Sequence, residues 1–200
     1  MNLTFAAQKL QHRPPRPAEN DRPCAILALL TEDRLILEVR SPLLRTQPGQ
    51  ICLPGGRIEQ DETPVQCALR ETEEELGLPT QQIEVLGQLD YYLHTTGQTV
   101  YPVLARLKEH HTEALRPNPA EVAEVFSVPL DWFRSHPPTA YEYQLQSVET
   151  DDLPAQLKLW LSHAAVRHRG IWWQYEDKLI WGLTAKVICQ VLDVTQEGQT

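Results

Sequence analysis

The chain has 200 residues, of which 42% are hydrophobic, so it is long enough and apolar enough to form one domain with a proper core. Its formal net charge of -9 argues against a protein that coats nucleic acid, because binding to phosphate backbones needs dense basic surfaces. The sequence shows neither a run of about eighteen apolar residues nor a charged and then apolar leader, and we therefore expect a cytoplasmic protein that does not enter a membrane.

The first predicted segment is a proline-rich lead-in. Residues 11–22 combine prolines with polar and charged residues, which is typical of extended chain rather than of a folded element. We therefore predict an extended lead-in at 1–22, a single domain at 23–195 and a tail at 196–200.

Apolar runs and helical spacing predict the elements of this domain. Cys24–Leu30 and Arg34–Arg40 are short apolar runs around a turn, and they predict a hairpin. Further strands are predicted at Gln50–Leu53, Ile83–Leu89, Thr99–Leu107, Val122–Val128 and Tyr141–Val148. Helices are predicted at Glu62–Leu76, Asp131–Arg134 and Leu183–Val194. Strands on both sides of a central helix indicate one mixed domain of the α/β or α+β class.

The cysteines show neither paired C-x-x-C spacing nor the density of a disulfide-rich scaffold. We predict reduced thiols, mostly packed in the core, at Cys24, Cys52, Cys67 and Cys189.

The central predicted helix carries the residues that indicate chemistry. Glu71, Glu74 and Glu75 stand at positions i, i+3 and i+4, so their carboxylates leave one face of the helix and can converge on a point. Anions held so close repel one another unless a cation lies among them, and hard oxygen ligands suit Mg²⁺ or Mn²⁺. Such an ion can bind phosphate oxygens and lower the pKa of a bound water. The alternative is a solvated acidic helix face.

Arg70 lies on the same helix surface as these glutamates. We predict that it orients them through a bidentate ion pair, with Glu62 as a partner two turns earlier.

The string from Gly56 to Leu78 resembles the sequence motif of the Nudix hydrolase superfamily. The fixed positions of that motif are filled here by Gly56, Glu62, Arg70, Glu71, Glu74, Glu75, Gly77 and Leu78. Thr72 stands where the motif has a bulky aliphatic residue, but its methyl group can still pack inward.

The resemblance implies a mixed β-sheet sandwiched between helices and the hydrolysis of a nucleoside diphosphate joined to another group, with Mg²⁺ or Mn²⁺ as cofactor. It implies that Glu71 and Glu75 bind the metal and that Glu74 joins them or handles a proton. The backbone carbonyl of Gly56 is implied as a further ligand.

The loop before this motif is similar to the signature of the coenzyme A pyrophosphatase branch of the superfamily. Matching positions are Arg40, Ser41, Arg45, Gly49, Pro54, Gly55 and Gly56. Ile36, Glu38 and Leu53 replace leucine, threonine and phenylalanine, and of these changes Glu38 is the one that alters chemistry. The segments Glu121–Leu130 and Trp181–Ala185 also resemble that branch. The implied reaction cleaves coenzyme A or a derivative to 3′,5′-ADP and a 4′-phosphopantetheine product.

Coenzyme A carries a 3′-phosphate besides its diphosphate, so its site should offer cations outside the metal cluster. Arg40 and Arg45 can supply them, and the alternative for both is a surface ion pair. Gly55 and Gly56 are assigned to substrate binding as well. The resemblance suggests Glu121 as a metal ligand or general base, and the alternative is a residue that only caps a strand.

Aromatic residues near the C-terminus, Trp172, Trp173, Tyr175 and Trp181, can stack on adenine or shape a pantetheine channel, but residues of this kind more often fill a core or a subunit interface. No role is assigned to His94, His110 and His111.

Two other functions remain open at this point. One keeps the chemistry but takes ADP-ribose or a nucleotide sugar, for which Glu38 and Leu53 leave room. The other is a module that senses a nucleotide without catalysis, against which the intact acidic cluster argues. In each case the expected partner is a small nucleoside diphosphate rather than nucleic acid or membrane, and a homodimer is left open.

Overall fold

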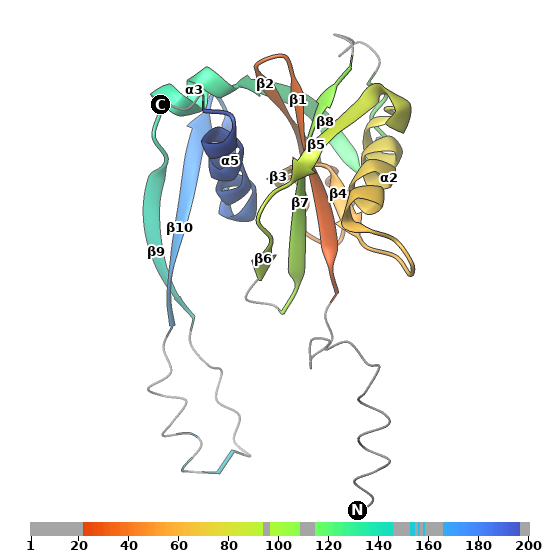
Figure 1. The fold of residues 1–200 in the computed structure, drawn as a ribbon. Coiled ribbons are helices and arrows are strands. Elements are labelled where there is room, and N and C mark those ends of the chain that lie inside the picture. Colours follow the sequence, from red (N-terminus) through yellow and green to blue (C-terminus); the bar gives the residue numbers. More distant parts are fainter. Residues whose placement is uncertain are drawn as a thin grey trace, which may run out of the picture.

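The computed structural model describes residues 22–93, 97–108, 115–145, 153–154, 156, 158 and 166–196 (Figure 1). The predicted lead-in and tail lie outside this part of the chain, apart from Arg22 and Gln196. The three histidines without an assigned role and residues 146–148 of a predicted strand also lie outside it.

Eight strands of the described residues form one mixed sheet. Its strands are β1 (Cys24–Thr31), β2 (Arg34–Arg40), β3 (Ile51–Cys52), β4 (Gly55–Arg57), β5 (Ile83–Gln88), β6 (Tyr92–Leu93), β7 (Thr99–Leu107) and β8 (Val122–Pro129). At the centre, β1 pairs parallel with β7 and antiparallel with β2 and β4. Antiparallel pairing to β2 adds β3 and β8, and antiparallel pairing to β7 adds β5 and β6.

A second, smaller sheet and the helices complete the domain. The smaller sheet has the antiparallel order β11 (Lys178–Trp181), β10 (Val166–Tyr175) and β9 (Thr139–Leu145). The helices are α2 (Pro64–Leu76), a short 3-10 turn η1 (Thr80–Gln82), α3 (Leu130–Ser135) and α5 (Gly182–Val194). In Figure 1, α2 lies on one side of the mixed sheet and α5 on the other, next to β10. The mixed α+β single domain expected from the sequence is confirmed.

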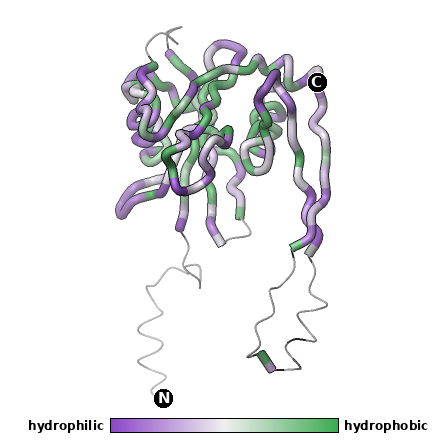
Figure 2. The backbone as a smooth tube through the Cα atoms, turned by 180° about the vertical axis from the view of Figure 1, so that it is seen from behind, coloured by the Kyte–Doolittle hydropathy of each residue, from purple (hydrophilic) through white to green (hydrophobic). Residues whose placement is uncertain are grey.

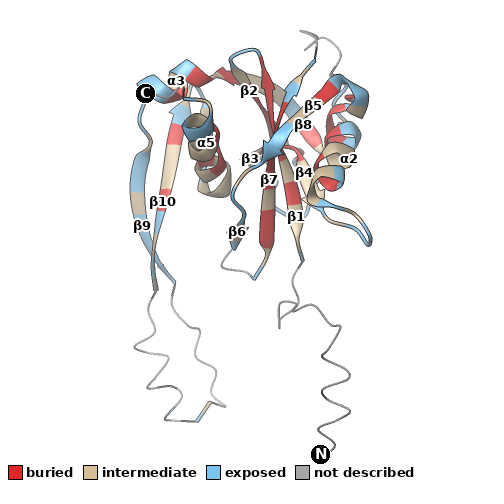
Figure 3. Ribbon diagram, viewed as in Figure 1, coloured by how far each residue is buried: buried red, intermediate tan, exposed pale blue. Residues whose placement is uncertain are grey.

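Both faces of the mixed sheet are buried, which explains the continuous apolar run in β1. Leu27 and Leu29 pack on the α2 side, whereas Ala28 and Leu30 pack on the α5 side, because successive side chains of a strand point in opposite directions. The buried residues concentrate in the central strands (Figure 3). From behind, hydrophobic segments lie toward the middle of the domain and hydrophilic ones in peripheral loops (Figure 2).

Helix α2 begins two residues after the predicted start, because Thr63 forms a capping box. The Thr63 hydroxyl accepts a hydrogen bond from the Gln66 backbone N–H at 3.3 Å, and the Gln66 side chain accepts one from the Thr63 N–H at 2.9 Å. At the other end, the Gly77 N–H donates to the Glu73 carbonyl at 2.9 Å. Glu62 therefore lies in the loop before the helix.

The sequence analysis missed β4, β6, β10 and β11. Strand β10 contains Arg167, His168, Arg169 and Gly170, so neither an apolar run nor a clean alternation reveals it. Among the described residues, no helix has the length and apolar character that crossing a membrane requires.

Candidate active site

The candidate site lies where the glycine turn of β4 meets helix α2. The Gly55 N–H donates a hydrogen bond to Glu75 Oε2 at 2.8 Å. Gly56 lies directly against Glu71, since a Cβ atom at position 56 would stand 2.3 Å from the Glu71 carboxyl carbon. Only glycine allows this approach, so the backbone of Gly56 itself forms one wall of the site.

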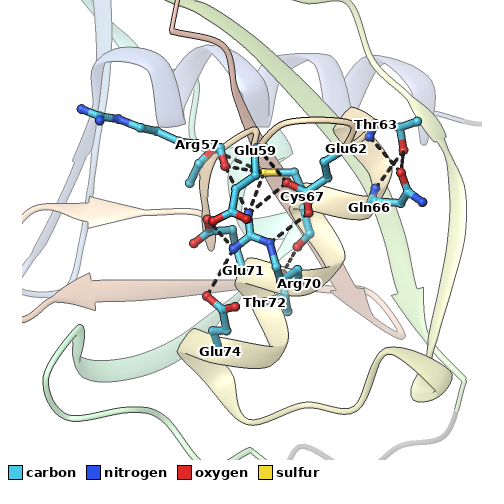
Figure 4. Close-up of polar contacts among 12 residues, drawn as sticks. Arg57, Glu59, Glu62, Thr63, Gln66, Cys67, Arg70, Glu71, Thr72 and Glu74 are labelled. Atoms are coloured by element: carbon cyan, nitrogen blue, oxygen red, sulfur yellow. Dashed lines mark hydrogen bonds and ion pairs between the residues drawn. The ribbon is translucent and has the colours of Figure 1, made fainter.

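Arg70 connects the loop before α2, helix α2 and strand β4 through hydrogen bonds (Figure 4). Its Nε and Nη2 donate to the two carboxylate oxygens of Glu62 at 2.9 and 3.1 Å, which confirms the predicted bidentate pair. Its Nη1 donates to Glu71 Oε1 at 2.9 Å and to Glu74 Oε2 at 3.3 Å, and Nη2 also donates to the Arg57 carbonyl at 3.1 Å. The hydrogen bond from Arg70 lowers the pKa of Glu62.

The three glutamates of α2 lie in different environments. Glu75 is buried, with 5% of its surface exposed, whereas the Glu74 side chain is 55% exposed. Burial, followed by the charge of Glu38, raises the pKa of Glu75 to about 8, while the Gly55 N–H opposes this shift. Burial also raises the pKa of Glu71, against the hydrogen bond from Arg70.

The predicted convergence of these carboxylates on one point is not present among the described residues, where no three Asp, Glu, His or Cys side chains are placed to hold a metal ion. Arg70 binds Glu71 and Glu74, and Gly55 binds Glu75, so their carboxylates are drawn to different partners. The donor set nevertheless suits a hard divalent cation, because it consists of carboxylate oxygens, and burial raises the pKa of Glu75 and Glu38 in spite of the charge of Arg40.

Glu38 is a member of this acidic region that the sequence analysis did not assign. It lies in β2 with 1% of its surface exposed, and its Oε1 accepts a hydrogen bond from the Cys52 thiol at 3.2 Å. Its Oε2 has no partner among the described residues. Burial raises the pKa of Glu38 to about 7, Cys52 and Arg40 lower it, and Glu121 raises it. The available signal was a carboxylate that interrupts the apolar run of β2.

Glu121 lies near this acidic region, and Thr72 packs inward as expected. The charge of Glu121 contributes to the raised pKa of both Glu38 and Glu71, so its carboxylate is near both groups. Its carbonyl accepts from the Ser41 N–H at 2.7 Å, which fixes the turn before β8. Thr72 is fully buried, and its hydroxyl donates to the Ala68 carbonyl at 2.7 Å, so its side chain does pack inward.

Arg40 and Arg45 are not equivalent in the structure. Arg40 lines a cavity of about 270 Å³, which is also bounded by Gly55 and Gly56. Its buried Nε has no hydrogen-bond partner among the described residues. Arg45 is exposed on the loop and does not line this cavity. The structure therefore brings one of the two predicted cations to the glycine turn.

The aromatic residues near the C-terminus divide into two groups. Trp173 is buried, and its indole N–H donates to the His136 carbonyl at 2.6 Å, as expected for a core residue. Tyr175 packs edge-on against Trp132. Trp181 instead is 42% exposed and lines the cavity that contains Arg40.

A group of glutamates beside a glycine turn, next to a cavity that contains an arginine, suits an enzyme that handles phosphate groups together with a divalent cation. Comparison with known proteins identifies the family. The model of the NUDIX domain matches residues 21–149. A protein from Photorhabdus laumondii named "Uncharacterized Nudix hydrolase NudL" is 35% identical over 194 residues, which cover 94% of each chain.

Other similar proteins share a smaller part of the chain. "Peroxisomal coenzyme A diphosphatase NUDT7" from Mus musculus is 42% identical over 114 residues, 56% of this chain and 46% of that protein. A crystal structure of a NUDIX hydrolase from Nitrosomonas europaea has a TM-score of 0.47 at 25% identity, covering 56% of this chain and 58% of that one.

The chain therefore belongs to the Nudix family, and it is a hydrolase that acts on diphosphate bonds. Hydrolases of this family generally use divalent metal ions.

Proposed function

We propose that this protein hydrolyses the diphosphate of coenzyme A or one of its derivatives to 3′,5′-ADP and a 4′-phosphopantetheine product, with Mg²⁺ or Mn²⁺ as cofactor. The observation that carries the proposal is Arg40, a cation that lines the same cavity as Gly55 and Gly56. Arg40 can therefore meet a second phosphate group on a substrate whose diphosphate lies at the glutamates. The similarity to a mouse coenzyme A diphosphatase supports this substrate.

In this proposal Glu71 and Glu75 would hold the metal, with Glu74 and the Gly56 carbonyl as further ligands. When bound, the ion would supply positive charge to the diphosphate oxygens and lower the pKa of a water. Arg70 orients Glu71 through the hydrogen bond at 2.9 Å and keeps β4 against α2. Glu121 is near Glu71 and accepts the proton of the attacking water.

Substrate binding in this proposal involves both arginines of the loop. Arg40 contacts the 3′-phosphate from the cavity, and Arg45 adds positive charge from the exposed loop. The Gly55 and Gly56 backbone leaves room for the diphosphate beside α2. A domain at 23–195 and a cytoplasmic location form part of the same proposal, and a homodimer is left open.

A second candidate is hydrolysis of ADP-ribose or a nucleotide sugar, and Glu38 is the observation that favours it. The charge of Glu38 is close enough to Arg40 for the two groups to affect one another. An ionised Glu38 reduces the positive potential available to a 3′-phosphate. A substrate without that phosphate does not require it.

The test is a panel of diphosphates. The purified protein is treated with EDTA, supplied with Mg²⁺ or Mn²⁺, and incubated with coenzyme A, dephospho-coenzyme A, ADP-ribose and nucleotide sugars. We expect 3′,5′-ADP and 4′-phosphopantetheine from coenzyme A, identified by mass spectrometry. Turnover of ADP-ribose or a nucleotide sugar without release of 3′,5′-ADP would favour the second candidate. Tight binding of a diphosphate with no turnover under either metal would make the protein a sensor.

A further inference from the structure

A second pocket adjoins the cavity that contains Arg40. It has a volume of about 380 Å³ and is lined by residues of β6, β9, β10 and α5, together with Trp181 at the end of β11. The residues that characterise this aromatic pocket are Leu93, Tyr141, Tyr143, His168, Trp181 and Lys186. None of them belongs to the machinery assigned above, and the volume falls within the range of about 300 to 1,000 Å³ that ligand pockets occupy.

The aromatic pocket adjoins the cavity at the candidate active site. Trp181, Gly182 and Leu183 line both the aromatic pocket and the cavity of about 270 Å³ that contains Arg40 and Gly56. A long ligand with its diphosphate at Gly56 can therefore extend along Trp181 into the aromatic pocket.

The wall formed by β9 and β10 consists of ring faces. Tyr141 lies opposite Gly170 in the register of the two strands, and Tyr143 lies opposite His168. The Tyr143 and His168 rings stack with centroids 5.2 Å apart, and the Tyr141 and Tyr143 rings stack at 5.9 Å. A Cβ atom at Gly170 would stand 2.2 Å from the Tyr141 ring, so the glycine lets that ring lie on the β10 backbone.

Two of these rings remain accessible, although Trp173, on the other face of the same small sheet, is buried. Tyr143 is 39% exposed and Trp181 42% exposed, whereas Trp173 is 3% exposed. Clustered exposed rings are typical of a binding surface. Lys186 adds a cation at the edge, and within the described residues its ammonium group forms no ion pair. The pocket therefore combines an apolar wall with a donor for a carbonyl oxygen.

We propose that the aromatic pocket binds the non-nucleotide arm of the substrate and is a subsite for an aliphatic acyl group at the end of that arm. This inference rests on the proposed function, because the arm of a coenzyme A derivative is a chain of amides that ends in a thiol or an acyl thioester. The acyl chain packs on the Tyr141 and Tyr143 rings, and Lys186 donates to the carbonyl oxygen. The protein then hydrolyses acylated substrates more efficiently than the free thiol.

The test compares kcat/KM for coenzyme A and octanoyl-coenzyme A in the wild type, in Tyr143→Ala and in the control Tyr91→Ala. Tyr91 is also an exposed tyrosine, at 61%, but does not line the pocket. We expect the wild type to prefer the acylated substrate by about tenfold, which corresponds to the burial of a few methylene groups. Tyr143→Ala should lower kcat/KM for octanoyl-coenzyme A by about three- to tenfold and that for coenzyme A by a smaller factor, because coenzyme A has the arm but no acyl chain. Tyr91→Ala should change neither.

A competitor without a diphosphate gives an independent measurement. Octanoyl-pantetheine should inhibit the wild type competitively and should inhibit Tyr143→Ala more weakly. His168→Ala provides a second variant if Tyr143→Ala does not fold, as judged by circular dichroism.

Equal kcat/KM for the two substrates in the wild type, or equal effects of Tyr143→Ala on both, would overturn the inference. So would a change of oligomeric state in Tyr143→Ala with substrate preference unaltered, since the pocket would then be a subunit interface. Failure of the proposed function has a different result, namely that neither substrate yields 3′,5′-ADP while ADP-ribose is cleaved.

Discussion

Helix α2 and the small sheet flank the cavity that contains Arg40, and they differ in how their functional side chains are exposed to water. Around α2, charged groups are held out of water by specific partners, as when Arg70 binds Glu62 and Glu71 or the Gly55 N–H binds Glu75. On the small sheet, Tyr143 and Trp181 leave apolar rings in water. Buried charges place reacting atoms within narrow limits, whereas exposed rings offer a surface that accepts different groups. The comparison suggests that chemistry and substrate range are encoded on separate elements.

The largest expected effect is on kcat, and it follows from substitution of Glu75, the buried glutamate of α2. Glu75→Gln should lower kcat by about a thousandfold or more, because the amide removes a negative ligand from the proposed metal site. The variant should fold, since the amide oxygen can still accept from the Gly55 N–H. Steady-state kinetics with Mg²⁺ and circular dichroism measure both properties.

Glu73→Gln is the matched control, because Glu73 is an exposed glutamate on the same helix. Its kcat should stay within about twofold of the wild type, since surface substitutions rarely disturb a distant site. Equal losses in the two variants would show that the charge of the helix, rather than the position of Glu75, supports activity.

Arg70→Lys tests whether the geometry of the charged region matters as well as its charge. Lysine keeps the positive charge but cannot bind Glu62 through two hydrogen bonds while also reaching Glu71 and the Arg57 carbonyl. We expect a loss of about 10- to 100-fold in activity or metal affinity, as for other residues that orient metal ligands. Titration with Mn²⁺ separates the two effects. Unchanged activity and affinity would mean that charge alone is sufficient.

Substitution of the two loop arginines tests which of them binds the 3′-phosphate of the substrate. Arg40→Ala should raise KM for coenzyme A by about tenfold or more and affect dephospho-coenzyme A much less, because the cavity loses a partner for the 3′-phosphate. Arg45→Ala should have a smaller effect, of about twofold to threefold, since an exposed charge is screened. Equal effects of Arg40→Ala on the two substrates would place the arginine at the diphosphate instead.

The smallest expected effect is on stability as a function of pH. Burial raises the pKa of Glu75 to about 8 and that of Glu38 to about 7, compared with the ordinary value of 4.5 for a glutamate. Between about pH 5 and 8 the folded protein thus binds more protons than the unfolded chain, and its free energy of unfolding falls as the pH rises. We expect the metal-free protein to lose at least about 1 kcal/mol over this range, or about 2–4 °C in Tm.

Thermal melts in EDTA from pH 5 to 8 measure this loss. Glu38→Gln should reduce the slope, because it removes one of the two buried groups and the repulsion that Glu75 experiences from it. Mg²⁺ should also reduce the slope, since a bound cation favours the ionised carboxylates. A free energy of unfolding that rises with pH in EDTA would contradict the raised pKa values.

The sequence indicated the charged region because the information for it is local. Glu71, Glu74 and Glu75 lie within five residues, and the order of the surrounding glycines and glutamates resembles a known motif. Within this region, the sequence did not show that Arg70 forms ion pairs with Glu71 and Glu74, since such pairs depend on side-chain rotamers and competing partners.

The small sheet was not predictable in the same way. Its wall depends on the register that places Tyr141 opposite Gly170 and Tyr143 opposite His168, which are 25 or more residues apart in the chain. Trp172 and Trp173 are adjacent in sequence, yet the strand turns them to opposite faces. The aromatic residues near the C-terminus indicated a packed region in the sequence. Which of them face the core and which line a pocket is decided only by the pairing of the strands.

The contact between Gly56 and Glu71 couples metal binding to diphosphate binding at a single position. A methyl group there must displace the Glu71 carboxylate and also occupies room that the proposed diphosphate needs, while Arg40 and Trp181 lie on other elements. A Gly56→Ala protein would thus lose cleavage and diphosphate binding together, and it is a suitable form in which to observe fragments of the substrate that lack the diphosphate in the two adjoining cavities.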